Sequence, residues 1–183
     1  FLLLEGGPRS RRQFLDWGVF HVEHSFVENW RRTKKSIANR NLLLKQRSPD
    51  FQQISAWDFE LCHAAREVDR ARSEYLRLFL PLLMKLYKDM RGAEAETLEI
   101  DYECGWDRGR ELEQVLLDNR DVDARYGATQ SGPHRADLSV RIGKSKAVDI
   151  LSRGQQKILV SCMKIAQGLL LSKALDRGCI FLL

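Results

Sequence analysis

One stretch of this sequence constrains the fold more than any other: between Ile54 and Leu82, apolar residues recur at heptad spacing. The intervals alternate between three and four residues over four repeats, the pattern of a helix packed along one seam in coiled-coil fashion. Pro81 lies inside the last repeat and predicts a kink or an end of the helix there. The seam consists of Ile54, Trp57, Leu61, Ala64, Val68, Ala71, Tyr75, Leu78 and Leu82.

A second long helix is predicted immediately before this one. Ser25 and Glu28 have the spacing of a capping box, and Ser48-Pro49-Asp50 ends the helix after about Arg47. Two long helices joined by a short turn pack antiparallel, so residues 22–95 are expected to form a helical hairpin. Two helices of a compact bundle remain the alternative. The apolar side of the first helix comprises Phe26, Val27, Trp30, Ile37, Leu42, Leu43 and Leu44.

The segments on either side of the hairpin have α/β character. Alternating patterns predict strands over 98–102 and 138–142, and helical patterns cover 108–119 and 155 to about 175. Gly6-Gly7-Pro8 predicts a turn before a segment in which Phe14, Leu15 and Trp17 can be buried. The apolar run 179–183 is typical of a strand buried in a parallel sheet. The acidic runs 94–99 and 118–123 are expected to be solvated linkers.

Composition excludes several classes of protein. The chain has 183 residues, of which 44% are apolar and 30% charged, enough for a globular core and unlike a disordered or low-complexity chain. Its apolar runs are far shorter than the roughly 20 residues of a membrane span, so no membrane partner is expected. The cysteines form no CxxC pair, and His21, Glu23 and His24 lack the spacing of metal ligands, so we expect reduced thiols and no metal site.

Positive charge is concentrated at the start of the chain. The net charge is +5, and the first fifty residues hold ten Lys and Arg against five Asp and Glu, a difference of +5. Cations spread along a helix suit contacts with a phosphate backbone, although a solvated helix face explains them equally well. The candidates for DNA contact are Arg31, Arg32, Lys34, Lys35, Arg40, Lys45 and Arg47 in the helix and Arg9, Arg11 and Arg12 before it.

The segment Leu151–Lys157 precedes an apolar helix and has the chemistry of an anion site. Ser152 is suited to cap the helix, Gly154 lets an anion approach the backbone, and the helix start presents N–H groups at the positive end of the dipole. Side-chain amides and cations of Arg153, Gln155, Gln156 and Lys157 add donors and charge. A simple capped helix is the alternative.

Four stretches resemble bacterial RecF proteins, which are SMC-like, ABC-type ATPases. Leu151–Lys157 resembles the signature motif of ABC-type ATPases. Gly6-Gly7-Pro8 with Arg11–Trp17 is similar to the family's GGP…RRxFLDW segment, and Leu43–Arg47 to its LLKQR helix. Gly132–Leu138 resembles the GPHRADL strand, which adds His134 and Arg135 as candidates for DNA contact, with an interface or structural role as the alternative. The four matches follow family order from residue 1 to residue 183.

The resemblance implies an α/β fold: part of an ABC-type, P-loop NTPase-like head with an inserted antiparallel hairpin arm. In this division residues 1–21 and 96–183 belong to the head, with the signature motif at 151–157 and a truncated Walker B strand at 179–183, and 22–95 form the arm. Nothing here resembles the family's P-loop, and the chain stops before the Walker B acidic pair. ATP and Mg²⁺ would therefore be bound by the full-length protein, and this chain alone would be catalytically inactive.

The resemblance also implies a function. RecF proteins bind and slowly hydrolyse ATP as dimers, with the signature motif contacting a nucleotide held by the partner subunit. The expected activity is ATP-dependent binding of single-stranded, gapped or junction DNA in recombinational repair, replication restart and the SOS response. The expected partners are a second copy and recombination mediator proteins, in the bacterial cytoplasm. The alternative is a protein-interaction arm with vestigial nucleotide chemistry; other SMC-like ATPases carry much longer insertions.

Overall fold

The computed structural model describes residues 2–92, 97–176 and 178, and they form two compact units. The first unit comprises residues 1–24, 72–102 and 137–183, and the second comprises 25–71 and 103–136. The long helix α4 (Phe51–Arg91) belongs to both, because its residues up to Ala71 lie in the second unit and those from Arg72 lie in the first.

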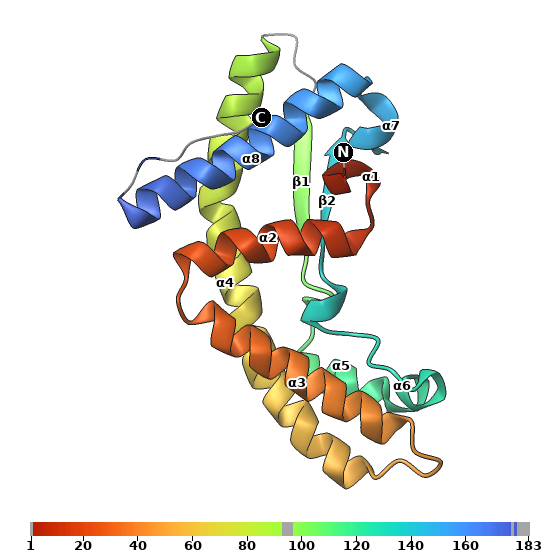
Figure 1. Cartoon of the computed structure of the whole chain (residues 1–183). Helices are drawn as coiled ribbons and strands as arrows, with labels where there is room; N and C mark the ends of the chain where they lie inside the picture. The colour runs from red at the N-terminus through yellow and green to blue at the C-terminus, as the bar shows by residue number, and fades with distance from the viewer. Residues whose placement is uncertain (1, 93–96, 177, 179–183) are drawn as a thin grey trace. The chain divides into compact units, whose positions relative to one another are not determined.

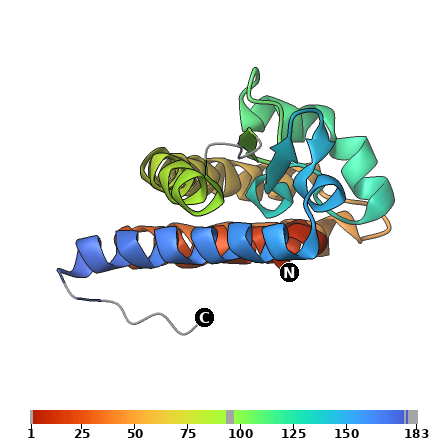
Figure 2. The ribbon, with the colours of Figure 1, turned by 90° about the horizontal axis from the view of Figure 1, so that it is seen from above.

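The first unit combines helices with a small sheet (Figure 1). The sheet has the order β1-β2-β3, and β2 and β3 are antiparallel, with Arg141 opposite Lys146 and Ile142 opposite Ser145. Helices α2 and α8 are in contact, and in Figure 2, seen from above, the blue α8 lies in front of the red α2. With the second part of α4, the elements are α1 (Leu2–Glu5), α2 (Pro8–Val22), β1 (Leu98–Glu103), β2 (Asp137–Ile142), β3 (Ser145–Lys146), α7 (Ala147–Ile150) and α8 (Arg153–Leu175).

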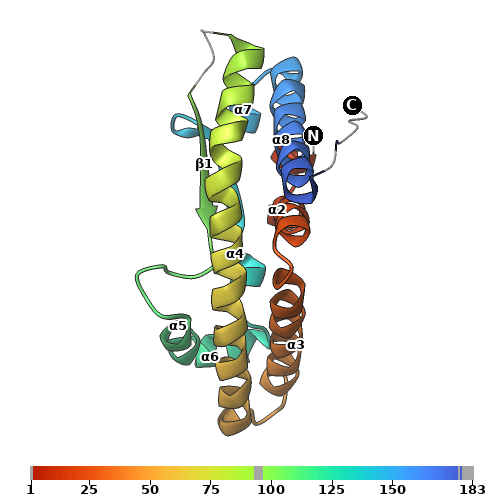
Figure 3. The same cartoon turned by 90° about the vertical axis from the view of Figure 1, so that its left-hand side faces the viewer.

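The second unit is built on the predicted antiparallel helix pair. Helix α3 runs beside the first part of α4 (Figure 3), and the ion pairs Arg32–Glu60 and Arg40–Asp58 join them in antiparallel order. Two short helices follow in the sequence, and a core of Leu61, Cys62, Ala65, Leu112 and Leu116 packs α5 against α4. With the first part of α4, the elements are α3 (Phe26–Leu44), α5 (Leu112–Asp118), α6 (Arg120–Tyr126) and the 3-10 turn η1 (Pro133–Arg135).

The predicted heptad seam is correct in its first part and wrong in its last. Six of its seven positions from Ile54 to Tyr75 are buried and Trp57 is half-buried, but Leu78 is 52% exposed. A straight α-helix drifts by about 20° per heptad against a 3.5-residue repeat, so the buried side moves one position along the helix. Beyond Tyr75 that side comprises Leu76, Phe79, Leu83 and Tyr87.

Pro81 does not end α4, which continues to Arg91. The residue is exposed. Proline has no N–H to donate to the carbonyl four residues earlier, but on the solvent side of a helix that carbonyl is accessible to water, so the cost of the missing hydrogen bond is reduced.

The remaining sequence predictions divide into confirmed elements and corrections. The predicted strands 98–102 and 138–142 and the turn at Gly7 are present, and the helix predicted over 155 to about 175 is present at 153–175. The helix predicted over 108–119 is shorter than expected and covers only 112–118. Ser25 precedes α3 but makes no side-chain cap hydrogen bond, because its backbone is already helical. The predicted apolar sides are wrong at Trp17 and Leu42, which are 47% and 64% exposed. The predicted strand 179–183 lies outside the described residues.

Two further findings concern solvent exposure. The acidic run 118–123 is not a solvated linker, since it spans the end of α5 and the start of α6 and its Asp123 is fully buried. The run 94–99 is described only from residue 97, where Leu98 and Glu99 begin β1. By length and composition alone, helix α8 is apolar and long enough to cross a membrane, and 33% of its most apolar 18-residue stretch is buried. The core helix of a soluble protein can have the same length and composition. Helix α8 alone therefore assigns no membrane location.

Candidate functional site

Ser152 caps the N-terminus of α8, as the sequence predicts, and the structure adds that it forms a capping box with Gln155. The Ser152 hydroxyl accepts a hydrogen bond from the backbone N–H of Gln155 at 3.4 Å. In return, the Ser152 N–H donates to Oε1 of Gln155 at 2.7 Å. The reciprocal pair satisfies two backbone donors and fixes the entry of the chain into the helix. Ser152 is therefore confirmed as the N-cap, and Gln155 uses its carbonyl oxygen, not its amide donor, in this motif.

Gly154 leaves the first turn of α8 open. A Cβ atom added there would meet nothing within 4 Å, and the residue is exposed together with Ser152 and Arg153. The first N–H groups of a helix lack intrahelical partners and lie at the positive end of its dipole. An anion can therefore approach the backbone of this turn from solvent.

The other three positions of the motif differ from one another. Arg153 forms an ion pair with Glu5 at the end of α1. Gln156 is buried, and its Nε2 donates to the carbonyls of Val148 at 3.0 Å and Leu151 at 2.8 Å. Gln156 thus fixes the junction between α7 and α8, whereas Lys157 is exposed to solvent.

The basic cluster Arg9, Arg11 and Arg12, which lies in the first turns of α2, is only partly exposed. Arg11 donates to both carboxylate oxygens of Asp137, at 2.7 and 2.8 Å, and to the carbonyl of Gly6 at 2.6 Å. It therefore ties the turn before α2 to the start of β2 within the first unit. Arg9 is exposed and Arg12 is half-buried. Of the three arginines, Arg9 is the most accessible to a polyanion.

The basic side of α3 holds most of the predicted exposed cations. Arg31, Lys34 and Lys35 are exposed on the helix, and Lys45 and Arg47 are exposed after it. The Lys34 ammonium lies 3.9 Å from the centre of the Trp30 ring, a cation–π contact that orients it. Arg32 is half-buried and bound to Glu60 at 2.8 Å, and this side-chain hydrogen bond raises the pKa of Arg32 and lowers that of Glu60.

The prediction that Arg40 belongs to this exposed side is wrong. Its side chain is 0% exposed, and its guanidinium donates to Asp58 and to Asp123, each at 2.6 Å, and to the hydroxyl of Thr129 at 3.0 Å. A cation enclosed in this way cannot contact a DNA phosphate directly. The burial of its charge is made possible by the two carboxylates.

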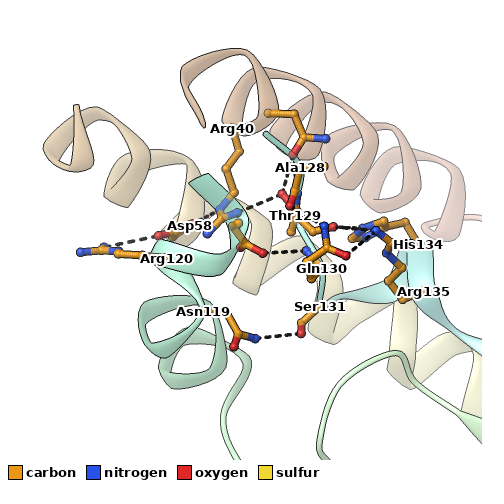
Figure 4. Close-up of polar contacts among 12 residues, drawn as sticks. Arg40, Asp58, Asn119, Arg120, Ala128, Thr129, Gln130, Ser131, His134 and Arg135 are labelled. Carbon is orange, nitrogen blue, oxygen red and sulfur yellow. Dashed lines mark hydrogen bonds and ion pairs between the residues drawn. The ribbon is translucent and has the colours of Figure 1, made fainter. Parts of the chain in front are cut away.

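Thr129 connects this buried cluster to the surface loop 128–135 (Figure 4). Both its N–H and its hydroxyl donate to Oδ1 of Asn41, at 2.8 and 2.7 Å. The next residue is held as well, since the N–H of Gln130 donates to Asp123 at 2.9 Å. The loop therefore rests on hydrogen bonds to α3 and α6 within the second unit.

His134 and Arg135 lie at the C-terminal end of the same loop. Nε2 of His134 lies 2.9 Å from the Thr129 carbonyl, and because that carbonyl can only accept, Nε2 carries the proton. The Arg135 guanidinium donates to the same carbonyl at 3.4 Å and to Oε1 of Gln130 at 3.0 Å. Arg135 is exposed, whereas His134 is half-buried.

The structure thus distributes the predicted site residues over separate places. The signature-like segment and Arg9–Arg12 lie in the first unit, and the α3 cations and the 128–135 loop lie in the second. Sequence reasoning missed the residues that organise the loop: Asn41, Asp58, Asp123 and Thr129. A signal existed only for Asp58, a carboxylate four residues after Ile54 and three before Leu61, and therefore on the buried side of α4.

Comparison with known proteins gives a consistent result. No family model matches the sequence. The chain is 45% identical over 183 residues to the DNA replication and repair protein RecF of Chromohalobacter salexigens, and 46% identical over 182 residues to that of Pseudomonas syringae pv. tomato. All of this chain is covered in both cases, and it covers 50% and 49% of these relatives. It therefore spans about half the length of the curated relatives it matches.

The fold agrees with the sequence. A solved structure of the recombination mediator protein RecF-ATP in the RecFOR pathway matches with a TM-score of 0.88 at 22% identity, over 97% of this chain and 50% of that one. A second, of RecF-ATPrS, matches with a TM-score of 0.86 at 23% identity. At these identities the structures show that the fold is shared, and the fold class predicted from the sequence is confirmed. The sequence similarity along all 183 residues, together with this shared fold, places the chain in the RecF family.

Proposed function

We propose that this chain is part of an ATP-dependent DNA-binding protein of recombinational repair and replication restart. Its relatives carry the name DNA replication and repair protein RecF, and a protein of the same fold is described with ATP. The observation that carries the proposal is the exposed, capped N-terminus of α8, where Gly154 leaves the backbone open. This arrangement offers N–H donors to an anion without displacing any side chain.

In this proposal the α8 terminus contacts a nucleotide held by a second copy of the protein. ATP with its Mg²⁺ supplies negative charge between the two copies. Ser152 directs its hydroxyl toward the γ-phosphate, Gly154 admits the phosphate to the helix N–H groups, and Lys157 adds a nearby cation. Arg153 is paired with Glu5, so it exchanges a carboxylate for a phosphate only if that ion pair opens. Dimerisation then depends on ATP, because the nucleotide completes the interface.

DNA is the second ligand in this proposal. The exposed cations of α3 and its C-terminal end are spaced along a rod and fit a phosphate backbone better than a set of base edges. Binding of this kind is independent of sequence and suits single-stranded, gapped or junction DNA. We place the protein in the bacterial cytoplasm, where it would act with recombination mediator proteins to help load the recombinase.

A docking function is the second candidate. In the second unit Phe59 is 70% exposed and Leu42 is 64% exposed. Large apolar side chains on the surface of a helix pair favour contact with a protein partner. In that case the hairpin binds a mediator protein, and DNA affinity does not depend on ATP.

The test is Ser152→Arg in the intact protein, with Ser152→Thr as its matched control. The arginine fills the space in front of the first helical turn, whereas threonine retains the hydroxyl and the cap. Loss of the cap costs only about 0.5–2 kcal/mol, so Ser152→Arg is expected to fold. We expect it to retain nucleotide binding, to lose the ATP-dependent dimer in sedimentation, and to bind gapped DNA equally with and without ATP.

The control separates the outcomes. Ser152→Thr should form the dimer as the unchanged protein does. An ATP-dependent dimer of Ser152→Arg would show that Ser152 is only a helix cap. If the unchanged protein bound DNA with the same affinity with and without ATP, that result would support the docking function instead.

A further inference from the structure

Arg135 differs from the other hydrogen-bonded arginines of its unit in the acceptors that hold it. Arg32, Arg40, Arg66, Arg70, Arg108, Arg110 and Arg120 each pair with a carboxylate. Arg135 is held by two neutral oxygens, the carbonyl of Thr129 and Oε1 of Gln130. Among the described residues no carboxylate pairs with it. Its guanidinium is therefore oriented, exposed and not neutralised.

The backbone that carries Arg135 can adopt few other conformations. Gly132 has φ +137° and ψ 178°, a region that only glycine occupies readily. Gly105 has φ +98°, and a Cβ atom there would lie 2.1 Å from the Gly132 carbonyl oxygen. The N–H of Gly132 donates to the carbonyl of Gly105 at 3.0 Å, and the N–H of Arg135 donates to the carbonyl of Gly132 at 2.8 Å. Two close glycines thus fix the turn that ends at Arg135.

The buried cluster holds the other end of the same loop. The Arg40 guanidinium contacts the Thr129 hydroxyl at 3.0 Å, and the Thr129 carbonyl in turn accepts from His134 and Arg135. The cluster is balanced in charge, because Arg40 and Arg120 face Asp58 and Asp123. A balanced, buried cluster contributes no net charge to the surface loop, so its effect on Arg135 is positional (Figure 4).

We propose that Arg135 binds a backbone phosphate of DNA and that Thr129, held by Arg40 and Asn41, is the residue that positions it. The proposal rests on the DNA-binding function proposed above and identifies a contact and its support. A guanidinium already fixed by neutral acceptors loses little conformational freedom on binding. Its planar donors suit a phosphate, and no carboxylate has to be displaced first.

Thr129 is a positioning residue because its side chain reaches α3 while its carbonyl reaches Arg135. Removing the hydroxyl breaks its own hydrogen bonds to Arg40 and Asn41, leaves the backbone N–H bond to Asn41 in place, and leaves the loop sequence around Arg135 unchanged. The loss of DNA affinity should then occur through Arg135 alone. This coupling distinguishes positioning from a general loss of stability.

The experiment measures binding of the intact protein to a fluorescently labelled gapped duplex by anisotropy, over a series of salt concentrations. Arg135→Ala is expected to weaken binding about tenfold, the effect of losing one charge-assisted hydrogen bond. It should also reduce the slope of log affinity against log salt by about one contact, roughly 0.9. Because Arg135 is exposed, this variant should keep its fold. Arg135→Lys should keep the salt slope but lose affinity.

Thr129→Val is expected to weaken binding roughly two- to tenfold in the unchanged protein. In the Arg135→Ala background it should have little further effect. Thr129→Ser, which keeps the hydroxyl, should restore affinity. The matched control is Thr33→Val, which removes a second buried threonine hydroxyl of the same unit, one without a hydrogen-bond partner and far from the loop in sequence. This control should leave DNA affinity unchanged.

Three outcomes would overturn the proposal. Unchanged affinity and salt slope in Arg135→Ala would remove the phosphate contact, leaving the loop to another ligand such as a protein. If Thr129→Val lowered DNA affinity by the same factor in the unchanged protein and in the Arg135→Ala background, Thr129 would not act through Arg135. Failure of the unchanged protein to bind DNA at all would overturn the proposed function and this contact together.

Discussion

Gly18 offers the sharpest test of how the first unit is packed, because the substitution Gly18→Ala adds one atom where three helices of that unit meet. Gly18 lies in α2 and is buried. A Cβ atom there would lie 2.4 Å from Oη of Tyr75 in α4 and 2.7 Å from Nε2 of Gln167 in α8. Real Cβ atoms do not approach other heavy atoms so closely, so either Tyr75 or Gln167 must move.

Neither side chain can move cheaply. Tyr75 is 5% exposed, its ring stacks on Phe79 at 5.6 Å between centroids, and Phe79 is 0% exposed. Gln167 donates to the Phe14 carbonyl at 2.9 Å and to the Tyr75 hydroxyl at 3.4 Å. The alanine gains about 1 kcal/mol of helix propensity, overpacking costs about 1–3 kcal/mol, and a broken hydrogen bond costs about 1 kcal/mol more. The free energy of unfolding should therefore fall by about 1–3 kcal/mol.

The assay is urea unfolding followed by circular dichroism, with Gly154→Ala as the matched control. The same substitution at Gly154 meets nothing within 4 Å and should leave the protein equally stable or raise its stability by up to about 1 kcal/mol. The added methyl group also occupies the approach to the α8 terminus, so this control should weaken ATP-dependent dimerisation. Equal stability of Gly18→Ala and the unchanged protein would refute the packing described for this helix junction.

Two further predictions concern the core of the second unit. Leu61→Ala removes a 0% exposed side chain of the α4 seam and should lower the free energy of unfolding by about 2–5 kcal/mol, whereas a protein of unchanged protease resistance would mean that the seam is misplaced. Burial, followed by the charges of Asp58 and Glu113, raises the pKa of Cys62 to about 12, so the folded state keeps a proton that the unfolded chain loses near pH 8.5. Stability should accordingly fall as pH rises above about 8.5, and Cys62→Ala should show a smaller fall; an identical pH dependence in both proteins would contradict the shift.

The sequence allowed the local elements to be predicted wherever one periodicity was dominant. The seam of α4 was visible because its members from Ile54 to Tyr75 face one side of a single helix. The N-cap of α8 was visible because Ser152 and Gln155 are neighbours in sequence and their hydrogen bonds are local. Local chemistry of this kind does not depend on the rest of the fold.

The errors arise where burial is decided by partners distant in sequence. Leu42 and Trp17 are apolar and lie on helices, yet they are 64% and 47% exposed. Asp123 stands in an acidic run that has the composition of a solvated linker, but it is buried because a cation 83 residues away meets it. Composition describes what a residue tends to do alone, and it cannot report an ion pair across such a separation.

Arg40 shows the same limit and its consequence for function. In the sequence it is one of several cations on a basic helix, equivalent in type to Arg31 and Arg47. Within the fold, Asp58 and Asp123 remove it from solvent, and the nitrogen that donates to Asp123 also donates to the Thr129 hydroxyl. The charge of Arg40, which the sequence assigned to DNA contact, is thus neutralised inside the protein. There it helps to hold the loop 128–135, which ends in a different cation, Arg135, that pairs with no carboxylate among the described residues. A count of basic residues therefore indicates the class of ligand better than it indicates which residues contact that ligand. A basic residue predicted to contact DNA can be buried, as Arg40 is, and then hold another part of the protein in place.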